Sequence, residues 1–348
     1  MKSNFYQRIL KEIEHDDSSQ AYILTITDGK NIGSKLFIRQ GSNGITDFDI
    51  TYEDSSLKPY WQDVLSIVQL EKAPYLESTM GIFVESLNPK VQVVVCGGGH
   101  VSLALSRLCD FMGYELTVLE DRQEFGNHQK FPNARRIIVD SFESIFKNNS
   151  FDKNSCFVIA TRGHLCDSVC LENIMELDFC YAGMIGSKRK IAKTKELMIS
   201  KGFSQEQFNL IKTPIGLPIG GQTPEEIAVS IIAEIIQHIN LTSRSYFSDI
   251  LKNALMSEND NMVIAKIISK SGSSPRGIGS QMIIKKDASI IDTIGGGMIE
   301  FSAINEALNI LNQEAPASSI KHYILNNEEA ASLGMWCGGN IDIFFDTI

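Results

Sequence analysis

The chain has 348 residues, of which 43% are hydrophobic and 21% charged, and its formal net charge is -10. This composition is typical of a soluble globular protein with enough apolar residues for two cores, and its acidity argues against nucleic acid as a partner. No apolar stretch reaches the roughly 18–20 residues of a membrane span. The first residues lack the apolar segment of a secretory signal, so we expect a cytoplasmic protein.

Seven cysteines are present, an odd number, and no two of them form a CxxC pair. In a reducing compartment they are expected to be mostly free thiols, packed as small hydrophobic residues. A disulfide framework is therefore not expected.

Residues 1–88 begin with a helical pattern, in which apolar side chains recur at helical spacing. These side chains belong to Phe5, Ile9, Leu10 and Ile13. Three strands and one further helix are predicted after it, at 21–27, 35–39, 82–85 and 61–70 respectively.

Residues 246–348 resemble a second copy of this first segment. Ile9-Leu10 matches Ile250-Leu251, Gly33-Ser34 matches Gly279-Ser280, and QDVLSIVQLEKAP resembles NEALNILNQEAP. We therefore predict a duplication in which the two copies pack together as one smaller α+β domain. Only the second copy has the SGSSPRG, GGG and CGG segments, so the first copy is expected to be structural.

The middle segment, 91–240, alternates strands and helices. A β-branched strand over Val91–Val95 is followed by a glycine loop, a helix over Val101–Met112 with Gly113 as its C-cap, and a strand over Glu115–Leu119. This order predicts a Rossmann-type parallel sheet, and hence an α/β fold class. Further strands are predicted at 136–139, 156–161 and 179–181.

The glycine loop, Gly97, Gly98 and Gly99, lets backbone N–H groups approach a pyrophosphate at the start of the helix. The carboxylates of Glu120 and Asp121 follow about 20 residues later, where a ribose-binding acid belongs. They favour NAD or another adenine nucleotide over NADP. The alternative is a Rossmann fold whose nucleotide site is vestigial.

Two histidines, His100 and His164, follow different strands of the predicted sheet. Because the carboxyl ends of parallel strands meet at one edge, they can share a site there. They are interpreted either as part of a nucleotide or metal site or as hydrogen-bonding surface residues.

Two helix starts in the same segment have structural interpretations. Lys188, Arg189 and Lys190 open a helix and either hold an anion or form a solvated basic turn. Thr223 and Glu226 have the spacing of a capping box, so Glu226 is interpreted as a cap residue and not a catalyst.

The last segment carries three candidate functional turns. Arg276 lies in GSSPRG, a GGG turn covers Gly295, Gly296 and Gly297, and Cys337 lies in MWCGG. Glycines around Cys337 leave room for a soft partner, and a nearby cation such as Arg276 would lower the pKa of its thiol. The alternative for Cys337 is a buried small hydrophobic residue.

Together these motifs resemble the XdhC/CoxI family of xanthine dehydrogenase accessory proteins. The matching pieces are GSSPRGIG, IGGGMIE and MWCGG, and in the middle segment CGGGHV, LEDRQEFGNHQKFPNA, TRGH, GMIGSKRK and PIGLPIGGQTPEEIAVSI. They cover about residues 91–348. The family usually places the GSSPR/GGG/CGG domain before the Rossmann domain, whereas here the recognisable copy follows it.

The resemblance implies a maturation factor that binds molybdenum cofactor (molybdopterin) and delivers its sulfurated form to a xanthine dehydrogenase-type molybdenum hydroxylase. Cys337 is then the candidate contact to the molybdenum–sulfur centre, because thiolates suit soft metal centres. Arg276 and Gly295–Gly297 would hold the pterin phosphate, and the Rossmann loop a nucleotide. A cysteine desulfurase or sulfurtransferase is a further expected partner.

Two other functions stay open. One is an NAD(P)-dependent oxidoreductase using the Rossmann domain, although no acid–base pair beyond His164 and Asp167 supports turnover. The other is a scaffold that binds the hydroxylase without holding cofactor. A homodimer is expected from the prevalence of two-fold oligomers.

Overall fold

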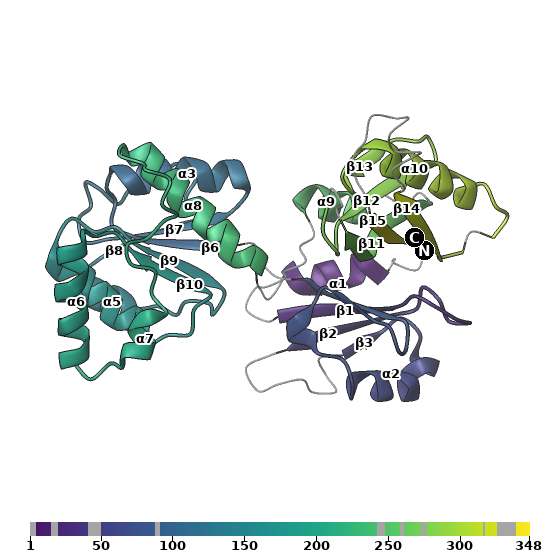
Figure 1. Cartoon of the computed structure of the whole chain (residues 1–348), viewed down its shortest axis with the longest axis horizontal. Helices are drawn as coiled ribbons and strands as arrows, with labels where there is room; N and C mark the ends of the chain where they lie inside the picture. Colours follow the sequence, from purple (N-terminus) through teal and green to yellow (C-terminus); the bar gives the residue numbers. More distant parts are fainter. Residues whose placement is uncertain are drawn as a thin grey trace. The chain divides into compact units, whose positions relative to one another are not determined.

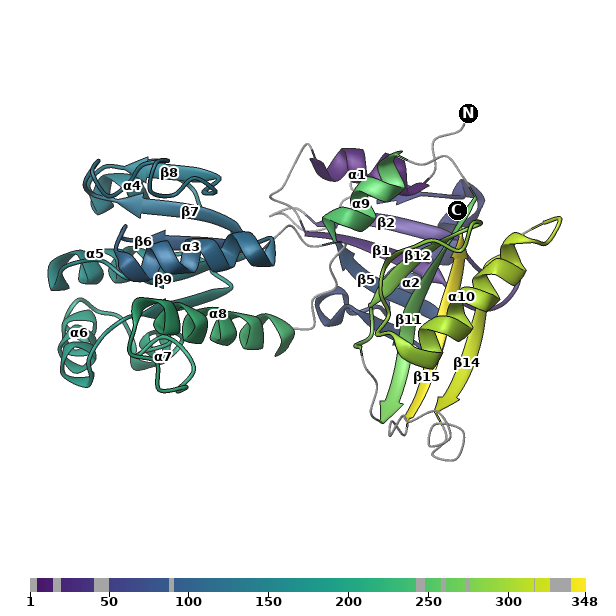
Figure 2. The same cartoon turned by 90° about the horizontal axis from the view of Figure 1, so that it is seen from above.

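The structure is a computed structural model of the chain, and it divides into two compact units. One unit comprises residues 90–242 and is called the Rossmann unit; the other comprises residues 1–89 and 243–348 and is called the composite unit (Figures 1 and 2). The residues that the structure describes are 5–14, 20–40, 50–87, 91–241, 248–257, 261–272, 276–315, 317–325 and 339–348. Within these ranges, every helix is too short or too polar to cross a membrane.

The Rossmann unit is built on five parallel strands in the order β10-β9-β6-β7-β8. The strands are β6 (Gln92–Cys96), β7 (Glu115–Glu120), β8 (Arg136–Val139), β9 (Ser155–Ile159) and β10 (Tyr181–Met184). The chain starts in the middle, at β6, and moves first to one edge and then to the other. The predicted Rossmann-type α/β fold is thus confirmed, and its topological switch point lies between β6 and β9.

Helices cover both faces of this sheet, as a parallel sheet requires. They are α3 (His100–Met112), α4 (Phe142–Asn148), α5 (His164–Met175), α6 (Lys188–Ser200), α7 (Gln205–Asn209) and α8 (Pro224–Leu241). One apolar core joins the sheet to α3 and α8, and a second joins its other face to α4, α5, α6 and α7. The helices on each face of the sheet therefore bury their apolar side chains in a separate core.

The local signals in this unit are largely confirmed. Gly113 adopts the left-handed conformation of a C-cap, with φ of 68°, and the hydroxyl of Thr223 and the carboxylate of Glu226 form the expected capping box. The strand predicted to reach Thr161 ends at Ile159, because the chain turns there into the loop at the switch point. The strand predicted at 179–181 begins only at Tyr181.

The composite unit contains two five-stranded antiparallel sheets with the same strand order. The first sheet is β3-β2-β1-β5-β4, and the second is β13-β12-β11-β15-β14. The strands are β1 (Gln20–Ile26), β2 (Lys35–Gln40), β3 (Ile50–Tyr52), β4 (Tyr75–Glu77), β5 (Ile82–Leu87), β11 (Met262–Gly272), β12 (Gln281–Lys285), β13 (Ile290–Asp292), β14 (Ser319–Leu325) and β15 (Gly339–Thr347).

The helices of the composite unit follow the same repeat. A helix precedes each sheet and another lies between its third and fourth strands; they are α1 (Phe5–Glu14), α2 (Lys58–Leu65), α9 (Asp249–Ser257) and α10 (Gly297–Leu311). Two short 3-10 helices, η2 (Ser55–Leu57) and η3 (Leu70–Lys72), belong to the first copy. This shared order of elements supports the duplication inferred from the sequence.

The repeat extends to single hydrogen bonds in the first hairpin of each sheet. Gly33 has φ of 90° and its N–H donates to the carbonyl of Ile26, while Gly279 has φ of 89° and donates to Ile267, both at 2.8 Å. A left-handed glycine is needed at both positions because other residues strain there.

The two sheets share one core. Their outer faces pack on α2 and α10 respectively, and their inner faces meet around α1 and α9. The N- and C-terminal segments thus form one unit, as the sequence predicted. Contrary to that prediction, the composite unit contains more residues than the Rossmann unit, so it is the larger of the two.

Candidate functional site

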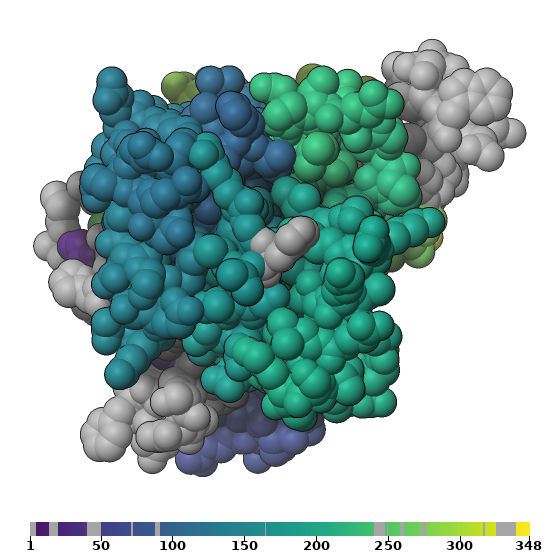
Figure 3. Space-filling model, turned by 90° about the vertical axis from the view of Figure 1, so that its left-hand side faces the viewer, coloured from purple at the N-terminus to yellow at the C-terminus, as the bar shows by residue number. Residues whose placement is uncertain are grey.

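The first candidate site lies at the carboxyl ends of the parallel strands, the end of the Rossmann unit that faces the viewer in Figure 3. The glycine loop follows β6, and Thr161, Arg162 and Gly163 follow β9, the neighbouring strand. Loops that leave two adjacent strands in opposite directions open a crevice between them. The structure therefore brings the two predicted loop segments together.

The first two glycines of the loop are explained by contacts within the chain. A Cβ at Gly97, where φ is 107°, would lie 2.5 Å from the carbonyl oxygen of Ala160. A Cβ at Gly98 would lie 2.5 Å from the carbonyl oxygen of Phe125. Both glycines are buried, whereas Gly99 is half-buried and His100 is exposed. The open part of the loop is thus its end, where α3 begins.

Glu120 is hydrogen-bonded to the glycine loop. Its carboxylate is 2% exposed and accepts a hydrogen bond from the N–H of Gly98. Burial raises the pKa of Glu120, and the bond from Gly98 opposes that shift. The carboxylate predicted to bind a ribose is therefore already bonded to the glycine loop, while that of Asp121 is more exposed and pairs with Arg122.

The loop that follows β7 places cations over the crevice. The guanidinium of Arg122 lies 4.4 Å from the ring centre of Phe125, and the ammonium of Lys130 lies 4.7 Å from it. Arg162, from the loop after β9, lies 3.5 Å from the same centre. Lys130 also donates to the carbonyl of Gly98 at 2.7 Å. Three positive charges therefore surround one aromatic ring at the switch point.

A second polar group lies at the start of α5. The carboxylate of Asp167 is completely buried, accepts from the hydroxyl of Thr161 at 2.7 Å and forms an ion pair with Lys190. Lys190 also donates to the carbonyl of Ile185 at 3.0 Å. Because its charge is matched within the protein, Lys190 joins α6 to α5 and is not part of a solvated turn, whereas Lys188 and Arg189 are exposed.

The histidines stand at the first positions of α3 and α5. The side chain of His164 is outside what the structure describes. Among the described residues, no group of three or more His, Cys, Asp and Glu side chains is placed to hold a metal ion. A metal shared by His100 and His164 stays a prediction.

The second candidate site is one end of the second sheet of the composite unit. Because β11, β12, β13 and β15 are antiparallel neighbours, β11 and β13 end where β12 and β15 begin. GSSPRG joins β11 to β12, the GGG turn follows β13, and CGG leads into β15. The described strand ends that flank the three turns singled out in the sequence therefore lie at the same end of the sheet.

The GGG turn opens α10 with three consecutive left-handed glycines. The values of φ at Gly295, Gly296 and Gly297 are 123°, 74° and 67°. The N–H of Gly296 donates to the carboxylate of Glu300 at 3.0 Å, and the hydroxyl of Thr293 donates to the same carboxylate. Nothing lies within 4 Å of a Cβ built at Gly296, so the turn is open on that side.

The other two turns are described only in part. Arg276 is exposed, and its carbonyl accepts from the ammonium of Lys270 at 3.5 Å. Cys337 lies outside the described residues. The strand ends next to these two turns are paired, since Gly272 at the end of β11 lies opposite Gly339 at the start of β15. The backbone thus brings the beginning of GSSPRG beside the end of CGG.

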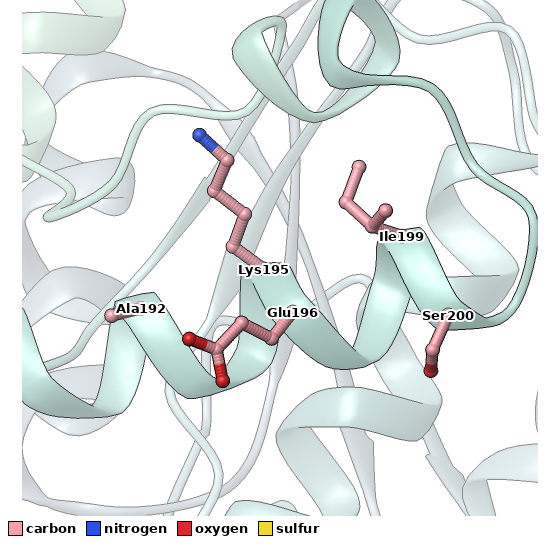
Figure 4. A pocket seen from close by; sticks show the side chains of 5 residues that line it. All are labelled: Ala192, Lys195, Glu196, Ile199 and Ser200. Carbon is pink, nitrogen blue, oxygen red and sulfur yellow. The ribbon is translucent and has the colours of Figure 1, made fainter.

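Sequence reasoning missed the cations Arg122, Lys130 and Arg162, because only folding gathers them at Phe125. The signal available was their place in loops after β7 and β9. A shallow hollow of about 500 Å³ on α6 is a weaker candidate. Its lining comes from a single helix face, with Lys195 and Ile199 on one side and Glu196 and Ser200 on the other (Figure 4), and it gathers no chemistry-bearing cluster.

Two family models match the chain, one in each unit. Residues 93–235 match the XdhC Rossmann domain, and residues 255–323 match the XdhC and CoxI family. The first match contains the glycine loop and the cation cluster, and the second contains the GGG turn.

Two curated proteins are similar over part of their length. A Bacillus subtilis protein, named as a probable subunit of xanthine dehydrogenase, is 28% identical over 176 residues, which are 51% of each chain. An uncharacterized Escherichia coli protein, YqeB, is 27% identical over 159 residues, which are 45% of this chain and 29% of that protein. The chain thus spans about half or less of the length of the relatives it matches.

A solved structure shares the fold. A Bacillus halodurans protein described as a xanthine dehydrogenase superposes with a TM-score of 0.53 and 21% identity, covering 67% of this chain and 65% of that one. The two family matches together cover more than half of the residues, and each lies on the unit that carries its motifs. The chain belongs to the XdhC and CoxI family.

Proposed function

We propose that this protein is an accessory factor of a xanthine dehydrogenase-type molybdenum hydroxylase, which binds molybdenum cofactor and delivers its sulfurated form. Family membership indicates the accessory role, and relatives carry the name xanthine dehydrogenase. The observation that carries the cofactor-binding part is that the strand ends flanking GSSPRG, GGG and CGG lie at one end of one sheet.

In this proposal each turn has a chemical role. Cys337 supplies a soft thiolate to the molybdenum–sulfur centre. Arg276 pairs with the phosphate of the pterin, and Gly295, Gly296 and Gly297 leave the amides at the start of α10 accessible to it. The carboxylate of Glu300 already accepts from Gly296, so an incoming phosphate competes with Glu300 for that N–H.

The Rossmann crevice is proposed to take a nucleotide, either as part of a dinucleotide form of the cofactor or as a separate molecule. His100, and Gly99 beside it, lie at the open end of the loop. A cysteine desulfurase or sulfurtransferase as sulfur donor, and a homodimer, complete the proposal.

The test is the cofactor content of the protein after co-expression with cofactor-synthesis genes. Molybdenum and the oxidised pterin should copurify in equal amounts, and the loaded protein should activate a cofactor-free hydroxylase. Cys337→Ala should lose most of the bound molybdenum, whereas Cys180→Ala, a cysteine of the Rossmann unit, should not. If Cys337→Ala retains cofactor as well as the parent, the proposed site is wrong.

An NAD(P)-dependent oxidoreductase is the competing function, favoured by the glycine loop at the switch point. Its test is oxidation of NADH with small carbonyl substrates by protein free of molybdenum. Turnover at enzyme-like rates, on the order of 1 per second or more, would refute a purely carrier role.

A further inference from the structure

Of the three cations around Phe125, only Arg122 forms an ion pair with described acids. Arg122 pairs with Glu120 and Asp121, at 3.6 and 3.4 Å. Within the described part of the chain, neither Lys130 nor Arg162 forms an ion pair with a carboxylate, although the charges of Glu120 and, more weakly, Glu124 act on Lys130 from a greater distance. Two positive charges without a direct ion-pair partner among the described residues therefore lie beside one aromatic ring in a protein whose net charge is -10.

These cations repel one another. The pKa of Lys130 is lowered, first by burial and next by the charge of Arg162; the charge of Glu120 opposes this shift, and Arg122 adds a smaller lowering. The π face of Phe125 attracts each cation, but it carries no net charge that could neutralise them. A bound anion would relieve the repulsion.

The position of the cluster identifies the kind of anion. Lys130 reaches the glycine loop through the carbonyl of Gly98 at 2.7 Å, and Arg162 directly follows Thr161 on the neighbouring side of the switch point. The cluster therefore straddles the crevice in which Rossmann domains bind nucleotides. Arginine in particular suits phosphate, because its planar guanidinium can donate two hydrogen bonds to one phosphate group.

We propose that Arg122, Lys130 and Arg162 form a binding site for the di- or triphosphate group of a nucleotide. This assignment rests on the proposed function in one respect, the identity of the molecule that carries the phosphates. That molecule is either a dinucleotide form of the pterin cofactor or a free nucleotide. The anion contacts come from side chains of the loops after β7 and β9, in place of the buried amide of Gly98.

This assignment changes the expected specificity. Glu120 is bonded to Gly98 and is 2% exposed, so it is not available to a ribose hydroxyl. The site therefore selects ligands by their phosphates, and Glu120 no longer favours NAD over NADP, the preference inferred from the acids alone.

The experiment is titration calorimetry of the full chain with adenosine, ADP, inorganic pyrophosphate, NAD and NADP at low and high salt. ADP and pyrophosphate should bind and adenosine should not, and raising the salt concentration should weaken binding. Arg162→Leu should weaken ADP binding by about tenfold or more, and Arg162→Lys by less. Arg107→Leu, an exposed arginine of α3 in the same unit, should bind ADP like the parent.

The proposal is overturned if adenosine binds as tightly as ADP, if none of the phosphate compounds binds, or if Arg162→Leu binds ADP normally. Thermal unfolding of Arg162→Leu should match that of Arg107→Leu, which separates loss of binding from loss of fold. Lys130→Met removes another positive charge of the cluster and provides a second, independent test.

Mass spectrometry of small molecules released from the co-expressed protein distinguishes the two sources of phosphate. A pterin linked to a nucleotide indicates the dinucleotide cofactor, and a free nucleotide indicates a separate ligand. A chain that binds ADP through Arg162 but never retains molybdenum would refute the proposed cargo and leave this site intact. A chain that retains molybdenum but binds no phosphate compound would do the reverse.

Discussion

The residues that join the two copies of the composite unit are charged as well as apolar. Lys35 of the first copy pairs with Asp346 of the second at 2.9 Å, and Lys266 of the second pairs with Glu85 of the first. All four are at most 3% exposed. Tyr6 adds a hydrogen bond to Asp346 at 2.7 Å. Each copy thus supplies one lysine and one acid to the other.

Loss of one partner in such a pair should be costly. Lys266→Met removes the lysine that pairs with the buried Glu85 and leaves only the weaker attraction of Lys35, and burial already raises the pKa of that carboxyl group. We expect the free energy of unfolding to fall by about 3–5 kcal/mol. Tryptophan fluorescence during urea unfolding measures this, because Trp61 and Trp336, the two tryptophans of the chain, both belong to the composite unit.

The control is removal of both charges. Lys266→Met combined with Glu85→Leu should recover most of the lost stability, because an apolar pair of similar volume avoids the desolvation of two ions. A double variant as unstable as the single one would show that the pair itself, and not the uncompensated charge, determines the stability.

Glu120 gives the Rossmann unit a predictable pH dependence. Its pKa is raised above its ordinary value of 4.5, chiefly by burial, so the folded state holds its proton more tightly than the unfolded state. Stability of the unit should therefore fall as pH rises from about 4.5 through the raised pKa. Glu120→Gln keeps an oxygen for the N–H of Gly98 and should remove this fall.

Urea unfolding followed by circular dichroism between pH 4.5 and 8 measures the effect, with tryptophan fluorescence reporting the composite unit in the same samples. An equal pH dependence in Glu120→Gln and the parent would assign the titration to another group.

At the scale of elements, the strands of the Rossmann unit and its helices α3, α6 and α8 could be predicted, whereas α4, α5 and α7 were not. Apolar β-branched strands and the capping residues Gly113 and Thr223 are local signals, and each acts within a few residues of its position. The duplication was also predicted from the sequence, and the shared strand order of the two sheets supports it.

What could not be predicted depends on contacts between distant positions. Gly98 was interpreted as room for a ligand, yet the group that approaches it closely is the carbonyl of Phe125, 27 residues later. Lys266 interrupts an apolar strand, and nothing near it in the sequence indicates that Glu85 is its partner. Such pairings are set by packing of whole elements, which periodicity does not specify.

The first hairpin of the first sheet tests this packing. Gly33→Ala should cost more than Gly29→Ala, although φ is similar at the two positions, 90° and 78°. A Cβ at Gly33 would lie 2.8 Å from the hydroxyl of Ser318 in the other copy, whereas nothing lies within 4 Å at Gly29. We expect about 1–2 kcal/mol for Gly29→Ala and about 1–3 kcal/mol more for Gly33→Ala.

Urea unfolding followed by tryptophan fluorescence measures the loss of stability in both variants. Adding Ser318→Gly to Gly33→Ala should remove the extra cost, because it deletes the two atoms that a Cβ at Gly33 would meet. An undiminished cost would locate the strain in the hairpin alone.

At the scale of the whole molecule, the two copies of the composite unit pack against each other as the two subunits of a dimer do. Phe83 and Phe344 occupy equivalent positions on β5 and β15 and meet in one apolar cluster. Glu85 and Asp346 are equivalent in the same way. The inner face of the second copy is therefore already covered by the first, and a homodimer of the whole chain would have to use another surface.

Separate fragments should reveal this dependence. The core between the sheets contains Leu251, Leu255 and Ile264 of the second copy together with Phe5, Ile9 and Phe37 of the first. Residues 243–348 alone would expose that apolar face along with Lys266 and Asp346, so we expect this fragment to self-associate or remain unfolded. Mixed with residues 1–89, it should form a one-to-one complex with a cooperative unfolding transition.

Residues 90–242 are the matched control, because both cores of the Rossmann unit lie within that range. This fragment should fold as a monomer without either partner. Analytical ultracentrifugation and circular dichroism of the three fragments, alone and mixed, decide the point. A monomeric, cooperatively folded 243–348 fragment would show that the first copy is dispensable, and the exchange of lysines and acids between the copies would then contribute little to the fold.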